Sequence, residues 1–126
     1  MNKTILIVDD EAHIRVLLEQ TLEDLEEEGV ELLAAANGQE ALEIIKNQTP
    51  SLVFLDVMMP KMNGFAVCQT VKHELQLQNT YIIMLTAKGQ EFDLQKGKEV
   101  GADLYITKPF DPDEVVEKSQ EILGLN

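Results

Sequence analysis

Hydrophobic residues fall into five short, continuous runs, and longer segments of mixed polarity separate them. Continuous apolar runs are typical of strands that are covered on both faces of a sheet. The runs therefore predict five strands, at Ile5–Val8, Leu32–Ala36, Leu52–Val57, Tyr81–Leu85 and Leu104–Ile106.

The segments that follow these runs carry apolar residues at the spacing of a helix that packs on one face. The first predicted helix stops at Gly29, and its apolar face contains Ile14, Leu17, Leu18, Thr21, Leu22 and Leu25. Further helices are predicted after Asn37-Gly38, from about Gly64, around Glu91–Val100 and after Asp111. Asp111 is suited to cap the last helix because Pro112 follows at the first helical position.

Alternating strands and helices predict an α/β fold, in which right-handed crossovers join parallel strands and helices cover both faces of the sheet. We therefore expect a doubly wound parallel sheet. The length of 126 residues is typical of one domain, and no linker or repeat interrupts it. Residues 1–126 are expected to fold as a single unit.

Polar side chains stand where four of the five predicted strands end. The first strand runs into Asp9 and Asp10, and the third ends in Asp56. The fourth runs into Thr86, and the fifth into Lys108. Ligands of open parallel sheets bind outside the carboxyl ends of the strands. We therefore expect three carboxylates, a hydroxyl and an ammonium at one edge of the sheet.

Neighbouring carboxylates repel one another unless a cation binds between them. Two unit charges about 5 Å apart repel by roughly 3 kcal/mol at an effective dielectric constant of 20. A ligand set made only of oxygen atoms favours Mg²⁺, with Mn²⁺ as the alternative. Lys108 would repel such an ion, so its position makes sense if an anion such as a phosphoryl group also binds.

A phosphoryl group would need an acceptor or a carrier at this edge. The sequence has no glycine-rich phosphate-binding loop, which argues against nucleotide binding. A carboxylate can act as the nucleophile and form an aspartyl phosphate. Asp56 is the best candidate, because it comes from an inner strand and the loop from Met58 to Gly64 can enclose the group it carries.

The composition narrows the classes of partner. The chain has 10 basic and 23 acidic residues, and the formal net charge of −13 disfavours direct binding to nucleic acid or to an anionic membrane. The longest apolar runs are too short to span a bilayer. The single cysteine, Cys68, cannot form an internal disulfide, which fits a reducing cytoplasm.

Four motifs, in this order along the chain, resemble the receiver domain of bacterial two-component response regulators. They are Val8-Asp9-Asp10-Glu11, Leu55-Asp56-Val57-Met58-Met59-Pro60 with Gly64, Leu85-Thr86-Ala87, and Gly101-Ala102-Asp103 followed by Tyr105-Ile106-Thr107-Lys108-Pro109-Phe110. The resemblance covers the chain from Lys3 to Leu123. It implies a five-stranded parallel sheet of order 2-1-3-4-5, flanked by five helices.

The resemblance implies a role for each residue of the acidic pocket. Asp56 would accept a phosphoryl group from a phosphohistidine, and Lys108 would pair with the phosphoryl oxygens. Asp10, Asp56 and the backbone carbonyl of Met58 would bind Mg²⁺ directly. Asp9 would act in the same pocket through metal-bound water.

The same resemblance implies a switch next to this pocket. Thr86 would move its hydroxyl onto the phosphoryl group, and Tyr105 would rotate inward as space near Thr86 is vacated. The peptide bond between Lys108 and Pro109 would be cis. Met58 and Lys88 stand two positions after Asp56 and Thr86, where the family tunes hydrolysis, and we expect both to hinder the attacking water.

The implied partners follow from this chemistry. The phosphodonor would be a sensor histidine kinase or a histidine phosphotransfer protein. A downstream protein would read the face formed by the fourth helix, the fifth strand and the fifth helix. The domain would be a signalling switch that promotes its own phosphorylation and dephosphorylation, as a monomer or a phosphorylation-dependent dimer. It would stand alone or belong to a longer regulator.

Other interpretations of the same residues stay open. A Mg²⁺-dependent phosphohydrolase could use Asp56 as a transient nucleophile, although such enzymes usually carry a second acid where Met58 stands and a cap insertion. A degenerate receiver could serve only as a binding surface. Asp9 and Asp10 could merely cap the first helix. Cys68 is expected to be an inert core residue, and His13 and His73 are expected at the surface.

Overall fold

Five parallel strands form a single sheet in the computed structural model, which describes residues 3–87 and 94–125. The order of the strands across the sheet is β2-β1-β3-β4-β5. Both the predicted doubly wound fold and the strand order that the resemblance implied are therefore confirmed. The strand bounds are β1 Lys3–Val8, β2 Val30–Ala35, β3 Leu52–Asp56, β4 Tyr81–Ala87 and β5 Leu104–Lys108.

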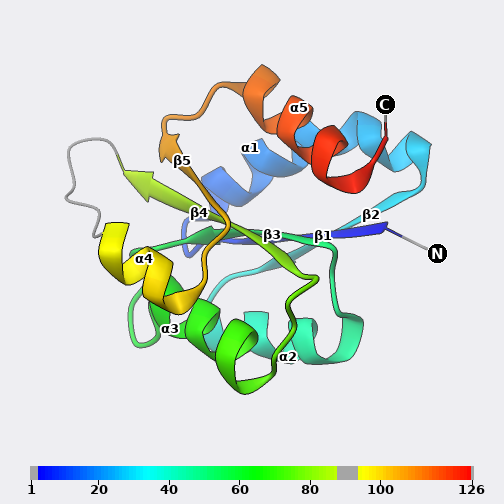
Figure 1. The fold of residues 1–126 in the computed structure, drawn as a ribbon. Coiled ribbons are helices and arrows are strands. Elements are labelled where there is room, and N and C mark those ends of the chain that lie inside the picture. The colour runs from blue at the N-terminus through cyan, green and yellow to red at the C-terminus, as the bar shows by residue number, and fades with distance from the viewer. Residues whose placement is uncertain (1–2, 88–93, 126) are drawn as a thin grey trace.

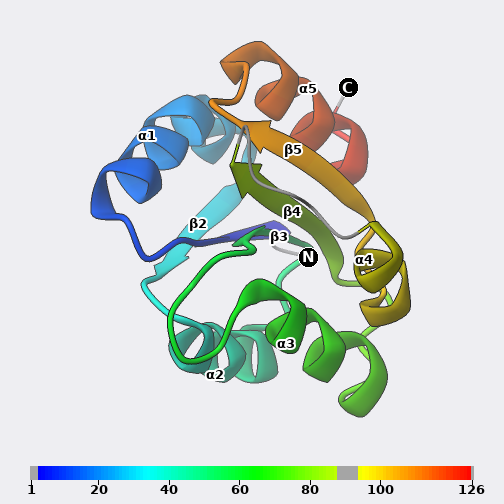
Figure 2. The ribbon, with the colours of Figure 1, turned by 90° about the vertical axis from the view of Figure 1, so that its left-hand side faces the viewer.

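Helices cover both faces of the sheet (Figure 1). Their bounds are α1 Ala12–Leu22, α2 Gly38–Gln48, α3 Gly64–Gln69, α4 Leu94–Val100 and α5 Pro112–Leu123. Helices α1 and α5 pack together on one face, and α2, α3 and α4 line the other (Figure 2). Within the described ranges, no helix is both long enough and apolar enough to cross a membrane.

Two helices continue in a different geometry from the one predicted. A 3₁₀ helix at Glu23–Glu28 extends α1 up to Gly29, whose φ of 88° ends it in the left-handed conformation that glycine adopts readily. A π-helical turn at Thr70–Glu74 extends α3. The predicted start of the fourth helix near Glu91 lies outside the described residues.

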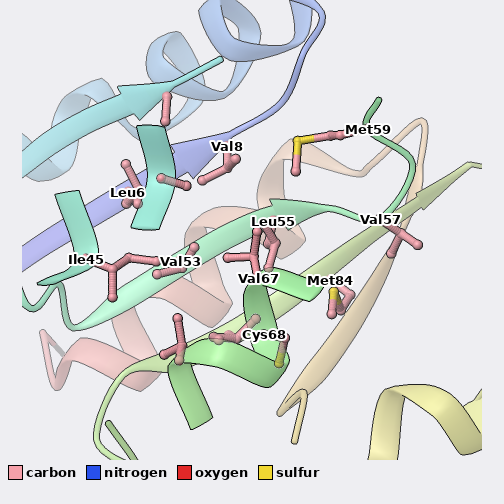
Figure 3. Packing of buried hydrophobic residues seen from close by; sticks show 14 of the residues in the cluster. Leu6, Val8, Ile45, Val53, Leu55, Val57, Met59, Val67, Cys68 and Met84 are labelled. Carbon is pink, nitrogen blue, oxygen red and sulfur yellow. The ribbon is translucent and has the colours of Figure 1, made fainter. Parts of the chain in front are cut away.

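Each inner strand sends alternate side chains to opposite faces, which creates two hydrophobic cores. In β1, Ile5 and Ile7 pack on the α1 and α5 side, whereas Leu6 and Val8 pack on the side of α2 and α3. Burial of one such side chain contributes roughly 1.5–3 kcal/mol. Figure 3 shows the second core, which includes Val53, Leu55, Val67, Cys68 and Met84.

The prediction for the buried face of α1 was wrong at one position. Leu17 is 45% exposed, and its neighbour Val16 is 50% exposed. Leu18 and Leu22 are completely buried, and Ile14 packs against the same core. Ile14, Leu18 and Leu22 are spaced by four residues and form the row through which α1 contacts the core. The buried face of the helix is therefore narrower than the predicted apolar face.

Other local predictions are confirmed. The side chain of Asp111 accepts a hydrogen bond from the backbone N–H of Asp113 at 3.0 Å and caps α5, with Pro112 at the first helical position. His13 and His73 are exposed. Burial of Cys68 raises the pKa of its thiol to about 12, as suits an unreactive core residue.

An ion pair between a buried lysine and a more exposed aspartate closes the edge of the sheet where the strands begin. Lys72 is 4% exposed, and its Nζ lies 3.0 Å from Oδ2 of Asp103. The same Nζ donates to the carbonyl of Thr80 at 2.7 Å, and Oδ2 of Asp103 accepts from the N–H of Ile82 at 2.8 Å. Because Thr80 precedes β4 and Asp103 precedes β5, one lysine ties together the starts of both strands.

The loop after Asp56 folds back so closely that residue 64 has no room for a side chain. Gly64 N–H donates to the carbonyl of Val57 at 2.9 Å. A Cβ atom at Gly64 would overlap the carbonyl oxygen of Asp56 and lie 2.9 Å from Cα of Val57. The start of α3 is therefore packed directly against the end of β3.

We predict that Gly64→Ala lowers the free energy of unfolding by about 1–3 kcal/mol, because the added methyl group meets backbone atoms that cannot move aside. Helix propensity alone would raise the free energy of unfolding by up to about 1 kcal/mol, because alanine favours a helix more than glycine does. A decrease would therefore indicate that the steric effect dominates. Urea denaturation measures the change. Ala66→Gly, at an exposed position of the same helix, is the control and should cost no more than about 1 kcal/mol. A stabilised Gly64→Ala protein would contradict the close approach.

Candidate functional site

Three of the polar residues expected at the strand ends meet at the carboxyl edge of the sheet, the side that faces the viewer in Figure 2. Nζ of Lys108 lies 2.9 Å from Oδ2 of Asp9 and 3.3 Å from Oδ1 of Asp56. In the register of β1 and β3, Val8 stands beside Leu55, so Asp9 and Asp56 follow side by side. The ends of β1, β3 and β5 thus deliver two carboxylates and an ammonium to one point.

The alternation of the strands explains why these three side chains converge. Asp9, Asp56 and Lys108 each stand two residues after a side chain of the core on the α1 and α5 side, and side chains two apart in a strand share a face. The preceding core residues are Ile7, Phe54 and Ile106.

The three charged groups are withdrawn from solvent. Asp9 is completely buried, Asp56 is 4% exposed and the Lys108 side chain is 14% exposed. Burial and the charge of Asp9 raise the pKa of Asp56 to about 7, although the Lys108 ammonium lowers it. Burial disfavours the charged form of Lys108, but the hydrogen bond to Asp9 and the charges of Asp56 and Asp9 outweigh this and raise its pKa.

Asp10 and Glu11 add further carboxylates at the rim. Both are exposed, and carboxylate oxygens of Asp9, Asp10 and Glu11 lie within 4.8 Å of one another. A hydrogen bond with Asp10 also contributes to the raised pKa of Asp56. These donors are all oxygen atoms, and the negative charge exceeds the positive charge of Lys108. The residues present therefore fit a hard divalent cation such as Mg²⁺.

The loop that follows Asp56 also contacts its carboxylate. The backbone N–H of Met58 donates to Oδ1 of Asp56 at 3.3 Å, so this oxygen interacts with both Met58 and Lys108. The Met58 side chain is 61% exposed, whereas Met59 is 7% exposed and packs in the core on the α2 and α3 side. The exposed methionine therefore stands at the mouth of the site.

Thr86 and Tyr105 are half-buried residues on the two neighbouring strands β4 and β5. Thr86 stands one residue beyond Leu85, which is the β4 partner of Asp56. Tyr105 lies beside Met84 in the register and packs against the core on the α2 and α3 side. Thr86, two residues after Met84, belongs to the same row, so both residues lie on the opposite face from Lys108.

The peptide bond between Lys108 and Pro109 is cis, as the resemblance implied. Lys88, which we expected to affect hydrolysis, lies outside the described residues.

The sequence did not indicate a role for Arg15, whose Nη1 donates to the carbonyl oxygen of Asp9 at 2.6 Å. It also missed Glu11 as a carboxylate of the rim, although Glu11 directly follows the aspartate pair.

The chain belongs to the response regulator receiver domain family, which its residues 5–120 match. The class of protein that the motifs resemble is therefore confirmed. The fold is similar to that of the chemotaxis protein CheY4 of Vibrio cholerae, with a TM-score of 0.84 and 34% sequence identity, covering 97% of this chain and 99% of that one.

Curated relatives include longer regulators. The chain is 48% identical over 119 residues to the probable transcriptional regulator ycf27 of Porphyra purpurea, covering 94% of this chain and 46% of the relative. It is 45% identical over 123 residues to the alkaline phosphatase synthesis transcriptional regulatory protein PhoP of Bacillus subtilis, covering 98% of this chain and 49% of the relative. The chain thus spans about half the length of these relatives.

We predict that, without divalent cations, Asp56→Asn makes the protein more stable than the wild type at pH 8. The folded-state pKa of about 7 lies above the unfolded value of about 3.9, so ionisation of Asp56 disfavours the folded state. Wild-type stability is therefore lost as the pH rises from about 4 to 7, and Asp56→Asn removes that loss. A pKa higher by about three units corresponds to a difference on the order of 4 kcal/mol above pH 7.

Urea denaturation of both proteins in a chelator, at pH 5.5 and at pH 8, measures this difference. Asp24→Asn, at an exposed position of the 3₁₀ helix, removes the same charge away from the site and is the control. A difference between wild type and Asp56→Asn that stays constant over this pH range would contradict the raised pKa.

Proposed function

We propose that this chain is a phosphoryl-accepting switch, in which Asp56 receives a phosphoryl group from a phosphohistidine of a partner protein. The observation that supports it best is the largely buried ammonium of Lys108, held 2.9 Å from Asp9 and 3.3 Å from Asp56 at the carboxyl edge of the sheet. An ammonium between two carboxylates is a ready ligand for the oxygens of a phosphoryl group on either of them.

Asp56 is the carboxylate best placed to act as the nucleophile. Asp9 is completely buried and already accepts hydrogen bonds from Lys108 and from the N–H of Glu11, so its oxygens are committed. Asp56 ends β3 at the mouth of the site. Its oxygen would form the new P–O bond as the P–N bond of the phosphohistidine breaks.

A bound Mg²⁺ would neutralise charge on the phosphoryl oxygens and hold them in place. Asp10, Asp56 and the backbone carbonyl of Met58 would bind it directly, and Asp9 would act through metal-bound water. The exposed rim position of Asp10 and the excess of carboxylates over ammonium groups support this assignment. Mn²⁺ would serve as a substitute.

Lys108 would move from its present carboxylates to the new phosphoryl oxygens. Carboxylate and phosphoryl oxygens both accept charge-assisted hydrogen bonds from an ammonium group. Thr86 follows the β4 partner of Asp56 near the end of the strand, and its hydroxyl would turn from its own face of the sheet onto the phosphoryl group. Tyr105, in the same row of the sheet, would follow into the space near Thr86. Thr86 and Tyr105 would thus have two arrangements, one before and one after phosphorylation. A partner protein would favour the arrangement that it binds more tightly.

The output surface would be the face formed by α4, β5 and α5, read by a downstream protein. The phosphodonor would be a sensor histidine kinase or a histidine phosphotransfer protein. Relatives named as transcriptional regulators are about twice as long as this chain. We propose that this chain itself, with a net charge of −13, does not bind nucleic acid and acts as a monomer or phosphorylation-dependent dimer.

We predict that incubation with Mg²⁺ and a small acyl phosphate, such as acetyl phosphate, adds one phosphoryl group to the protein. Intact-protein mass spectrometry detects the adduct. Asp56→Asn should give none, because the amide cannot form an acyl phosphate. Removal of Mg²⁺ with a chelator should suppress the adduct in the wild type as well.

The control Asp24→Asn should be phosphorylated like the wild type, since it leaves the site intact. Steady release of phosphate from unrelated organic phosphates would instead indicate a phosphohydrolase. Absence of an adduct with every donor would indicate a domain that only binds partners. Either result would contradict the proposal.

We also predict that Met58→Asn shortens the lifetime of the phosphorylated protein by roughly several-fold. The Met58 side chain stands at the mouth of the site, 61% exposed, and its bulk would hinder an attacking water. Asparagine is shorter and can hold a water by hydrogen bonding. The measurement is the decay of the adduct after the donor is removed.

Met58→Leu retains the bulk without the polar group and is the matched control, with an expected lifetime close to that of the wild type. Equal lifetimes for Met58→Asn and Met58→Leu would show that the side chain at this position does not control hydrolysis.

A further inference from the structure

Asp9 is completely buried, and each of its polar groups has a partner. Lys108 Nζ lies 2.9 Å from Oδ2, and the N–H of Glu11 donates to Oδ1 at 3.0 Å. The N–H of Asp9 donates to the carbonyl of Ala35 at 3.3 Å. Its carbonyl oxygen accepts from Nη1 of Arg15 at 2.6 Å, and this bond is the fourth that holds the residue.

The bond from Arg15 determines the orientation of the peptide between Asp9 and Asp10. A peptide group is planar, so holding its oxygen also holds the N–H and the Cα atom of the next residue. Asp10 is exposed, so the position of its carboxylate depends on this backbone rather than on packing around the side chain. Arg15 therefore lies one peptide away from the rim carboxylate that is proposed to bind Mg²⁺.

The stability of α1 does not account for the positive charge of Arg15 at this position. Arg15 is in the first turns of α1, which begins at Ala12, and a positive charge near the N-terminus of a helix opposes its dipole. Glu11 at the N-cap position forms no side-chain capping bond that could compensate. Arg15 is also the only arginine in the sequence.

We propose that Arg15 is a positioning residue for the cation site. By holding the carbonyl of Asp9, it fixes the direction in which the Asp9 and Asp10 carboxylates approach the cation. This inference rests on the proposed function, and it adds a residue that acts on Mg²⁺ through the backbone rather than by direct contact.

The charge of Arg15 and its hydrogen bond have opposite effects on Mg²⁺ affinity. Removing a positive charge beside several carboxylates strengthens the binding of a cation. Removing a group that orients the metal ligands weakens it, typically by tenfold or more. The sign of the change in affinity therefore separates a positioning role from a purely electrostatic one.

The test is the Mg²⁺ dissociation constant of the whole chain, measured by isothermal titration calorimetry. Arg15→Ala should bind Mg²⁺ roughly tenfold more weakly than the wild type. Arg15→Lys keeps the charge and a donor and should recover most of the affinity, to within about threefold. Lys46→Ala removes a positive charge at an exposed position of α2 and should leave the dissociation constant unchanged.

A second readout is the rate of phosphorylation by acetyl phosphate as a function of Mg²⁺ concentration. Arg15→Ala should need about tenfold more Mg²⁺ for half of its maximal rate but should reach a maximal rate close to that of the wild type. Thermal unfolding in a chelator shows whether each variant folds. If Arg15→Ala does not fold, Arg15→Gln takes its place in both measurements with the same expected shift.

Unchanged or tighter Mg²⁺ binding by Arg15→Ala, while the wild type binds normally, would overturn the inference. A variant that melts earlier in the chelator but keeps the wild-type dissociation constant would do the same, since it would show a role in folding alone. Failure of the wild type itself to bind Mg²⁺ or to be phosphorylated contradicts the proposed function, so the two failures are distinguishable.

Discussion

One lysine ammonium, largely withdrawn from solvent between two carboxylates, constrains the rest of this molecule. Charges that leave water must be paired closely, because the cost of desolvation otherwise exceeds the attraction. Lys108 meets this condition only if the ends of β1, β3 and β5 stop at the same level, although β4 lies between two of them. The parallel register of the whole sheet, with its two alternating cores, therefore serves to bring three side chains from distant parts of the chain to a single point.

The charges at that point do not balance. Asp9 and Asp56 share one ammonium, and Asp10 and Glu11 add negative charge at the rim. Burial, and after it the charge of Asp9, raise the pKa of Asp56, and a proton is one way to relieve the cost of ionising this carboxyl group. A divalent cation would be another, and it would leave the carboxylate ionised, as the proposed phosphoryl transfer requires. The same excess of negative charge that disfavours the folded state thus prepares the site for a cationic ligand.

Much of this arrangement could be predicted from the sequence, since continuous apolar runs mark inner strands and polar residues at their ends must meet at one edge. The pattern did not show which apolar stripe of α1 is buried, because Leu17 and Leu18 both suit a helical face and only the narrow row with Ile14 reaches the core. Arg15 could not be assigned, because it bonds to a backbone carbonyl, which has no sequence signature. The Lys72 and Asp103 pair was missed for a related reason. Its lysine comes from a π-helical turn, a geometry that the 3.6-residue period does not reveal.

That second lysine has a mechanical consequence. Lys72 anchors the residues before β4 and β5 to one another, so the two strands share a fixed base at the edge far from Lys108. Strands joined in this way cannot slide along each other when the charge at their far ends changes. Any relative movement of the two strands is therefore expected to be smallest at this base and larger toward their carboxyl ends. Thr86 stands near the carboxyl end of β4, so the place at which the proposed switch would act is far from this anchor.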